Sequence, residues 1–197
     1  IEALKNYDVT LQFYGDDCLQ TEIYAKKKAE DKGMIWVSPY NDTDIIAGQG
    51  TIGLEICESL DNIDYVLGTI GGGGMMSGVS SWFKYRSPKT QVIGCLPQNS
   101  PEMYLSLKQG RIVHLEEAME TLSDGSAGGL EENSITYDIC KNNIDDFILT
   151  TEEEIAASIK FMATRHHKII EGAAGVALGG FIKNCEKFKR KTGVSSS

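Results

Sequence analysis

The sequence predicts an α/β fold in which a parallel sheet carries helices on both faces. Three observations support this prediction: strand-like and helix-like segments alternate along the chain, the central strand-like segments are continuously apolar, and a glycine-rich turn joins one of them to a helix. Strands that are apolar on both sides are typical of parallel sheets buried between two helix layers. With 41% hydrophobic residues, the 197-residue chain has enough apolar surface for such a core.

The first part of the chain contains the patterns of two strands and two helices. Val9–Tyr14 alternates as a strand, and Cys18–Lys32 has the pattern of a helix that ends at Gly33. Met34–Val37 is a short apolar strand, and a helix with its core at Thr51–Leu60 follows a polar turn. These segments form the first expected β–α alternation.

The rest of the chain continues the alternation and ends in a polar tail. Strands are expected at Tyr65–Ile70, Gln91–Cys95 and Asp145–Leu149, and helices at Met75–Arg86, Pro101–Gln109 and Glu171–Lys187. Leu122–Asn133 is loop-like, and Thr150–Glu154 has the pattern of a capped helix start with acids in its first turn. The basic and then serine-rich tail, Lys187–Ser197, is expected to be loose.

The net charge of −9 limits the classes of partner. Nucleic acids and anionic membrane surfaces require a basic protein surface, so we expect neither as a partner. The five cysteines are scattered and form no CxxC pair, which is typical of a reducing compartment; we therefore expect a cytoplasmic protein. A phosphate ligand would have to be held by local donors against an unfavourable overall field.

Four consecutive glycines, Gly71–Gly74, lie between the Tyr65–Ile70 strand and the next helix. Because glycine lacks a Cβ, such a run lets backbone N–H groups converge on one point. The helix adds its unpaired N-terminal donors and the positive end of its dipole. The loop therefore predicts a site for the phosphate of a small cofactor. A tight strand-to-helix turn is the alternative, but one glycine would serve for that, and four adjacent glycines weaken a packing reason.

Four motifs, taken in this order and spacing, match one family. They are Asp44–Glu55 (DIIAGQGTIGLE), Gly71–Met75 (GGGGM), Leu122–Gly125 (LSDG) and Glu171–Val176 (EGAAGV). Singly, each has a structural interpretation, such as a helix cap, a surface loop or a small-residue packing face. Together they resemble the fold-type-II pyridoxal-phosphate enzymes, in the branch of threonine/serine dehydratase and serine racemase. The resemblance covers essentially the whole chain and implies part of a two-domain fold.

The resemblance implies where the cofactor, pyridoxal 5'-phosphate, is bound. Its phosphate would lie on the backbone amides of Gly71, Gly72, Gly73, Gly74 and Met75. This agrees with the interpretation of the glycine loop from its residues alone.

Three further cofactor-binding residues follow from the resemblance. Tyr40 corresponds to the aromatic residue or Asn near the cofactor ring, although an ordinary turn aromatic is an equal alternative. Gly125 would lie in the loop beside the ring, and Glu171 near its polar rim. Glu171 has a rival interpretation as a helix N-terminal acid that the dipole favours.

Two expected motifs are absent from the sequence. The family's Schiff-base lysine lies in a Ser-x-Lys-x-Arg-Gly-Ala-like motif, and the substrate carboxylate is bound by a Ser-x-Gly-Asn-like loop; neither occurs here. We therefore expect residues 1–40 to be a remnant of the small domain and residues 41–197 to be most of the large cofactor-binding domain. The family's Ser-Gly-Gly-Asn-like strand, which contacts the pyridine nitrogen, would begin where Ser195–Ser197 ends the sequence.

The expected activity is that of an ammonia-lyase, or dehydratase, that converts L-threonine or L-serine to a 2-keto acid and ammonia. Serine racemase-like activity, and a non-catalytic cofactor-binding relative or fragment, are the alternatives. We expect no catalytic residue in this portion, and a homo-oligomer or association with the missing segment. We also expect no metal site, because Leu96 stands where serine racemase has a glutamate ligand and leucine offers no oxygen to a hard cation.

Overall fold

The computed structural model describes all residues except 1, 16, 116–118, 190–191 and 197. The chain forms two compact units, Ile1–Trp36 and Val37–Ser197, so the division falls slightly before the domain boundary that the sequence predicts after Tyr40. The correspondence of these units to the small and large domains stays a prediction. Every helix among the described residues is too short or too polar to span a lipid bilayer.

The first unit consists of two helices joined by irregular chain. A 3-10 helix spans Glu2–Asn6, and helix α1 spans Cys18–Asp31, which confirms the helix predicted there. The Asp17 side chain caps α1 by accepting a hydrogen bond from the Gln20 amide at 2.7 Å.

The first two strands that the sequence predicts are wrong. Val9–Tyr14 and Met34–Val37 form no strand. Both contain highly exposed apolar side chains, such as Phe13 and Ile35. A strand needs a neighbour to pair its backbone groups. Among the residues that the structure describes, neither segment pairs with a neighbouring strand.

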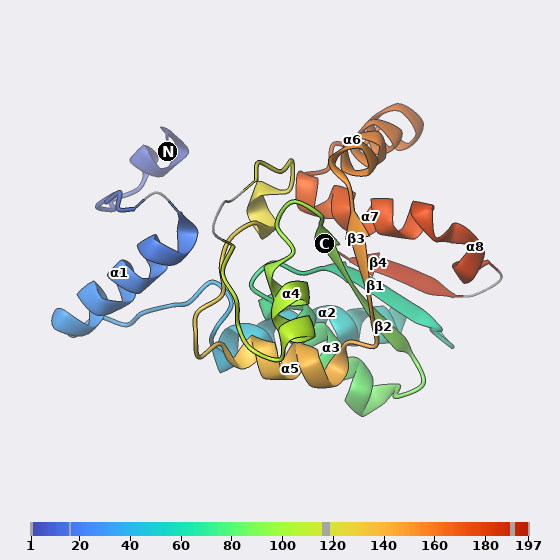
Figure 1. Ribbon diagram of the computed structural model, residues 1–197, viewed down its shortest axis with the longest axis horizontal. Helices are drawn as coiled ribbons and strands as arrows, with labels where there is room; N and C mark the ends of the chain where they lie inside the picture. The colour runs from blue at the N-terminus through green and yellow to red at the C-terminus, as the bar shows by residue number, and fades with distance from the viewer. Residues whose placement is uncertain (1, 16, 116–118, 190–191, 197) are drawn as a thin grey trace. The chain divides into compact units, whose positions relative to one another are not determined.

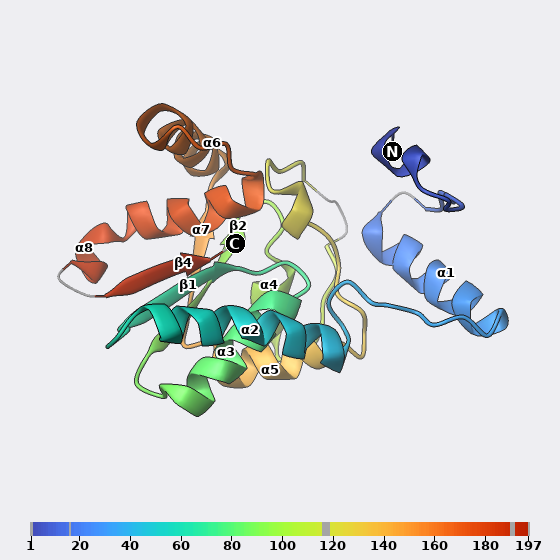
Figure 2. The same ribbon diagram turned by 180° about the vertical axis from the view of Figure 1, so that it is seen from behind.

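The second unit is built on a four-stranded, fully parallel sheet in the order β3-β2-β1-β4. The strands span Tyr65–Thr69 (β1), Gln91–Pro97 (β2), Asp146–Thr150 (β3) and Gly193–Ser196 (β4). Figures 1 and 2 show helices on both sides of this sheet. The predicted fold class is therefore confirmed.

Alternate residues of the central strands point into two separate cores. Val66 and Val92 face a core that is completed by helices α2 (Thr43–Ser59), α3 (Gly74–Arg86), α4 (Glu102–Gln109) and α5 (Ile135–Asn143). Leu67 and Ile93 face a second core, under α6 (Glu152–Phe161), α7 (Gly172–Lys183) and α8 (Cys185–Phe188). Because both faces are buried, the strands have no polar face, which explains their continuous apolar sequence.

Helix α6 begins as its sequence predicts. The Thr151 hydroxyl accepts a hydrogen bond from the Glu154 amide, and the Glu154 carboxylate accepts one from the Thr151 amide at 2.9 Å. This reciprocal capping box satisfies two backbone donors that the helix itself leaves unpaired. A five-residue π-helix, Met162–His166, follows α6.

The prediction of a loose tail at Lys187–Ser197 is wrong for Gly193–Ser196, while residues 190–191 and 197 lie outside the described residues. Gly193–Ser196 forms β4, which pairs in parallel with β1, and the Asp64 carboxylate accepts a hydrogen bond from the Thr192 amide at 3.0 Å. Serine has little intrinsic preference for strands. Pairing with an already buried strand supplies the backbone hydrogen bonds that the local sequence does not favour.

Helix α2 begins at Thr43, well before its predicted core. It therefore contains the glycine-rich segment Ala47–Thr51, which we expected to lie ahead of the helix. The Asp42 side chain caps its start by accepting hydrogen bonds from the first-turn amides. The glycines are tolerated because α2 crosses α3 at very short range. A Cβ on Gly78 would collide with the Ile46 carbonyl and the backbone of Gly50.

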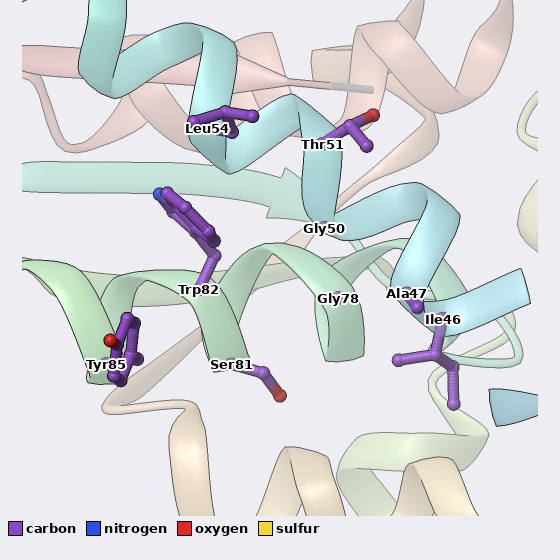
Figure 3. A pocket seen from close by; sticks show the side chains of 9 residues that line it. All are labelled: Ile46, Ala47, Gly50, Thr51, Leu54, Gly78, Ser81, Trp82 and Tyr85. Atoms are coloured by element: carbon purple, nitrogen blue, oxygen red, sulfur yellow. The ribbon is translucent and has the colours of Figure 1, made fainter. Parts of the chain in front are cut away.

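Figure 3 shows this crossing, with Gly50 and Gly78 facing each other. Beside it lies an open groove of about 360 Å³, whose walls include Leu54 on α2 and Trp82 on α3. The Trp82 ring occupies the space that a side chain at Gly53 would need. Tertiary packing thus outweighs the low helix propensity of these glycines.

Replacing Gly78 tests whether this close crossing holds the two helices together. We expect Gly78→Ala to lower the free energy of unfolding by about 1–3 kcal/mol, because the added methyl group overpacks a backbone contact. Gly48→Ala is the matched control: it lies on the same helix pair with no atom within 4 Å of an added Cβ. It should raise stability by up to about 1 kcal/mol through helix propensity alone. Urea unfolding of both variants measures the difference, and equal effects would contradict the packing interpretation.

Candidate functional site

The glycine loop connects the carboxyl end of β1 to the amino end of α3. Gly73 is the N-cap residue of α3 and has a left-handed backbone with φ of +87°, and no side chain caps the helix. The first amide bonded back to this loop is that of Ser77, which donates to the Gly73 carbonyl at 2.8 Å. The preceding amides of the first turn therefore have no intrahelical acceptor and are available to an anion.

Every glycine of the loop lies against another segment of the chain. A Cβ on Gly71 would lie 2.7 Å from the Ser126 carbonyl oxygen, and a Cβ on Gly73 would lie 2.9 Å from the Met103 methyl group. Positions 72 and 74 are blocked by Tyr40. This corrects the inference that adjacent glycines lack a packing reason: each of the four permits a close contact, and together these contacts set the position of the loop.

Tyr40 lies directly against the glycine loop. Its side chain is 8% exposed, and its ring fills the space that a side chain on Gly72 would need. Its hydroxyl accepts a hydrogen bond from the Glu131 amide at 2.9 Å. Tyr40 therefore supports the loop by packing, and its predicted contact with a cofactor ring stays a prediction.

The predicted second loop also reaches the glycine loop. Its 3-10 turn, Asp124–Ser126, brings the Ser126 backbone next to Gly71, and the buried hydroxyls of Ser123 and Ser126 lie 2.5 Å apart. Gly125 is exposed, with no atom within 4 Å of where its Cβ would be. The structure thus places the loop beside the phosphate-binding candidate and leaves Gly125 accessible.

Glu171 is the N-cap residue of α7, where the dipole favours an acid, and its side chain is exposed and does not cap the helix. One contact holds this end of α7 near the end of β1, and a second holds it against the 122–126 loop. The Thr69 hydroxyl donates to the Ala173 carbonyl at 2.6 Å, and Gly172 lies against the Leu122 carbonyl. The predicted role of Glu171 near a cofactor ring stays a prediction.

All sequence-predicted site segments therefore gather at the carboxyl end of β1: the glycine loop with Met75, Tyr40, the 122–126 loop and the start of α7. Sequence reasoning missed Thr69, Ser126 and Thr136, the last of which donates a hydrogen bond to the Gly72 carbonyl. Thr69 is only two residues before Gly71 and Ser126 directly follows Gly125, but nothing in the sequence marks either of them as a contact partner. Thr136 comes from a segment whose approach only the fold decides.

The described residues near the sheet include one buried acid and two buried thiols with shifted pKa values. Burial raises the pKa of Glu102, which is 6% exposed, although a hydrogen bond from the Ser100 hydroxyl at 2.7 Å acts in the opposite direction. Burial raises the pKa of both Cys95 and Cys140 to about 12, so neither is a thiolate nucleophile at neutral pH.

Among the described residues, no group of three or more His, Cys, Asp or Glu side chains is arranged to hold a metal ion. Leu96 is 1% exposed and packs in the apolar core.

A parallel sheet whose first strand leads through a glycine loop to an uncapped helix N-terminus is typical of α/β proteins that bind phosphorylated ligands. The comparison with known families is more specific. A family model described as pyridoxal-phosphate dependent enzyme matches residues 1–196, and the chain belongs to this family.

Individual relatives carry dehydratase and racemase names. Threonine dehydratase from Nicotiana attenuata is 35% identical over 191 residues, which cover 97% of this chain and 31% of that protein. The structure of the processed form of threonine deaminase isoform 2 from Solanum lycopersicum matches with a TM-score of 0.83 and 33% identity, over 92% of this chain and 53% of that one. Serine racemase from Dictyostelium discoideum matches with a TM-score of 0.77 and 30% identity, over 90% and 56%. The chain thus spans between about a third and just over half of these relatives.

The raised pKa of Glu102 predicts a particular pH dependence of stability. Because the folded state holds this proton more tightly than the unfolded chain, the stabilisation is complete below the ordinary value of 4.5 and is lost as the pH rises through the folded pKa. We expect Glu102→Gln to gain stability relative to the wild type as the pH is raised from about 4 to about 7. Urea unfolding at a series of pH values measures this gain.

Asp146→Asn is the control with the opposite sign. The hydrogen bond from Lys187, at 2.7 Å, lowers the pKa of Asp146, so its stabilisation is present above the ordinary value of 3.8 and is lost as the pH falls. This variant should therefore be the less stable one at neutral pH and should approach the wild type in acid. If the stability of both variants relative to the wild type changed with pH in the same direction, the assigned causes would be contradicted.

Proposed function

We propose that this chain is the cofactor-binding part of a pyridoxal-phosphate-dependent ammonia-lyase that converts L-threonine or L-serine to a 2-keto acid and ammonia. Its relatives of 33–35% identity carry the names threonine dehydratase and threonine deaminase. The single observation that carries the proposal is the glycine loop at the uncapped start of α3.

The residues present fit the cofactor's phosphate. In the proposal, the amides of Gly71, Gly72, Gly73, Gly74 and Met75 donate to the phosphate oxygens, and the α3 dipole adds a favourable field. Backbone donors are suited to this protein because its net charge of −9 gives no general attraction for an anion. The observation that supports the fit is the left-handed Gly73 N-cap, which leaves the first amides of α3 without a side-chain acceptor.

The neighbouring residues complete the proposed cofactor site. Tyr40 buttresses the loop from one side through its contacts with Gly72 and Gly74. Gly125 would lie in the loop beside the ring and Glu171 near its polar rim, since both are exposed. The loop of Gly125 packs on Gly71, and the start of α7 packs on that loop and bonds to Thr69. When bound, pyridoxal phosphate supplies an electron-withdrawing ring that stabilises negative charge at the substrate Cα.

No residue of this chain is assigned a catalytic role. The lysine motif that the family uses for covalent attachment of the cofactor does not occur in the sequence, so we assign residues 1–40 to part of the small domain and residues 41–197 to most of the large one. The proposed contribution of this chain is to bind and orient the phosphate, while covalent attachment requires a lysine from elsewhere.

Serine racemase activity is the second candidate, because a serine racemase structure matches at 30% identity. Leu96 favours the lyase over the racemase, since it cannot supply the oxygen ligand expected of the racemase metal site. A non-catalytic cofactor-binding relative is the third candidate, supported by the absent lysine motif. Measuring 2-keto acid, D-serine and ammonia after adding L-threonine or L-serine distinguishes the three, provided that the cofactor-loaded protein is assayed together with its lysine-bearing segment.

The partners and location form part of the same proposal. We infer a small hydroxy-amino acid as substrate, and a homo-oligomer or association with the lysine-bearing segment, which would cover the exposed apolar side chains of the first unit. A cytoplasmic location is supported by the five cysteines, all of which are free thiols.

The phosphate site is tested by placing a negative charge beside it. Met75 is the second residue of α3 and is partly exposed. We expect Met75→Glu to weaken binding of pyridoxal phosphate at least about tenfold, because a carboxylate competes with phosphate for the same amides. An acid in the first helical turn is favourable to the helix itself, so the variant should keep its fold. Equilibrium dialysis with absorbance detection measures the affinity.

Met75→Gln is the matched control, since glutamine has the length and polarity of glutamate but carries no charge. It should bind pyridoxal phosphate within about threefold of the wild type, and pyridoxal, which lacks the phosphate, should be insensitive to both substitutions. The proposal fails if Met75→Glu binds the cofactor as tightly as Met75→Gln does. Glutamate at this position is a cleaner test than aspartate at Gly72, where any side chain would also collide with Tyr40.

A further inference from the structure

One hydrogen bond fixes the centre of the glycine loop from outside it. The Thr136 hydroxyl donates to the Gly72 carbonyl at 2.6 Å, and the Thr136 side chain is completely buried. Thr136 lies in the first turn of α5, a helix from a distant part of the sequence. The loop conformation thus depends on a residue that belongs to none of the motifs shared with the family.

A second hydroxyl orients the first. The Ser134 hydroxyl lies 2.6 Å from that of Thr136 and is itself buried. A threonine hydroxyl has only one proton. Because Thr136 donates its proton to Gly72, Ser134 must be the donor to Thr136. The three groups therefore form an ordered chain that runs from Ser134 through Thr136 to the Gly72 carbonyl.

This chain controls the direction of the next amide. In a planar trans peptide, the carbonyl of Gly72 and the N–H of Gly73 point in opposite directions. A carbonyl held towards Thr136 therefore turns the Gly73 N–H to the opposite side of the loop. Glycines on both sides of this peptide would otherwise let it rotate at little steric cost. Gly73 lies close to Thr136 as well, since a Cβ added to Gly73 would be 3.1 Å from the Cβ of Thr136.

We propose that Thr136 is a positioning residue of the phosphate site, which holds the Gly72–Gly73 peptide so that the Gly73 amide faces the bound phosphate. The inference rests on the proposed function, because it assigns the glycine loop to the cofactor's phosphate. Thr136 does not touch the ligand. It acts by disfavouring the alternative orientation of the Gly72–Gly73 peptide. Phosphate binding then spends no free energy on reorienting this peptide.

The test compares Thr136→Val with Thr136→Ser in the full chain. Valine keeps the shape of threonine and removes the donor, while serine restores the donor. We expect Thr136→Val to raise the Kd for pyridoxal phosphate about tenfold and Thr136→Ser to stay within about twofold of the wild type. Calorimetry gives the Kd, and the ³¹P resonance of the bound cofactor should shift in the valine variant and return to its wild-type position in the serine variant.

Thr90→Val separates positioning from general destabilisation. Thr90 is 1% exposed, donates to the Ile63 carbonyl at 2.7 Å and is also bonded to a serine, but it precedes β2 at the opposite end of the sheet. It should lower the melting temperature about as much as Thr136→Val does and leave the Kd for pyridoxal phosphate unchanged. A merely structural role for Thr136 predicts the same behaviour in both variants.

The outcomes distinguish the inference from the proposed function. If the wild type binds pyridoxal phosphate and Thr136→Val binds it equally well, the positioning role is overturned and the phosphate site stands. If the wild type does not bind pyridoxal phosphate, both are overturned. Should Thr136→Val not fold, Ser134→Ala takes its place: loss of the orienting donor should weaken binding about threefold, and wild-type affinity in that variant would overturn the inference.

Discussion

The close approach of several chain segments to the backbone of the β1–α3 loop is the constraint on which the candidate site depends. The Ser126 backbone, the Tyr40 ring and the Met103 methyl group all lie where side chains on the loop would be. A residue larger than glycine would have to displace backbone, a buried ring or the Met103 side chain, so the loop and its surroundings fit only as a set. The left-handed Gly73 adds a conformational requirement to this steric one.

The same packing gives the loop its electrostatic character. An uncapped helix start inside a protein leaves amide dipoles without an acceptor, a cost that a bound anion removes. Tyr40 and Thr136 contact the backbone of the loop, so in the proposed function these dipoles need no rearrangement to meet a phosphate. A rigid local field of this kind is effective in a chain of net charge −9, where the overall field repels anions.

The fold shows how far neighbouring segments outweigh local preference. Val9–Tyr14 has a strand pattern and is not a strand, because no described segment of its unit pairs with it, whereas polar Gly193–Ser196 becomes a strand beside β1. Ala47–Thr51 is helical despite its glycines, because α2 gains a close contact with Gly78. In each case the energy of pairing or packing exceeds the propensity of the residues.

The sequence by itself determined the parallel α/β class, the positions of β1, β2 and β3 along the chain, the capped start of α6 and the place of the glycine loop between a strand and a helix. These features depend on residues that are close together in the chain, and their physical causes are local: apolar continuity, helix capping and the absence of a Cβ. Only the tertiary structure decided that Tyr40 packs on Gly72, that Thr69 bonds to the start of α7 and that Thr136 orients the Gly72 peptide. Those contacts join residues far apart in the chain, and a hydroxyl or a ring carries no mark of its distant partner until the sheet and helices bring the two together.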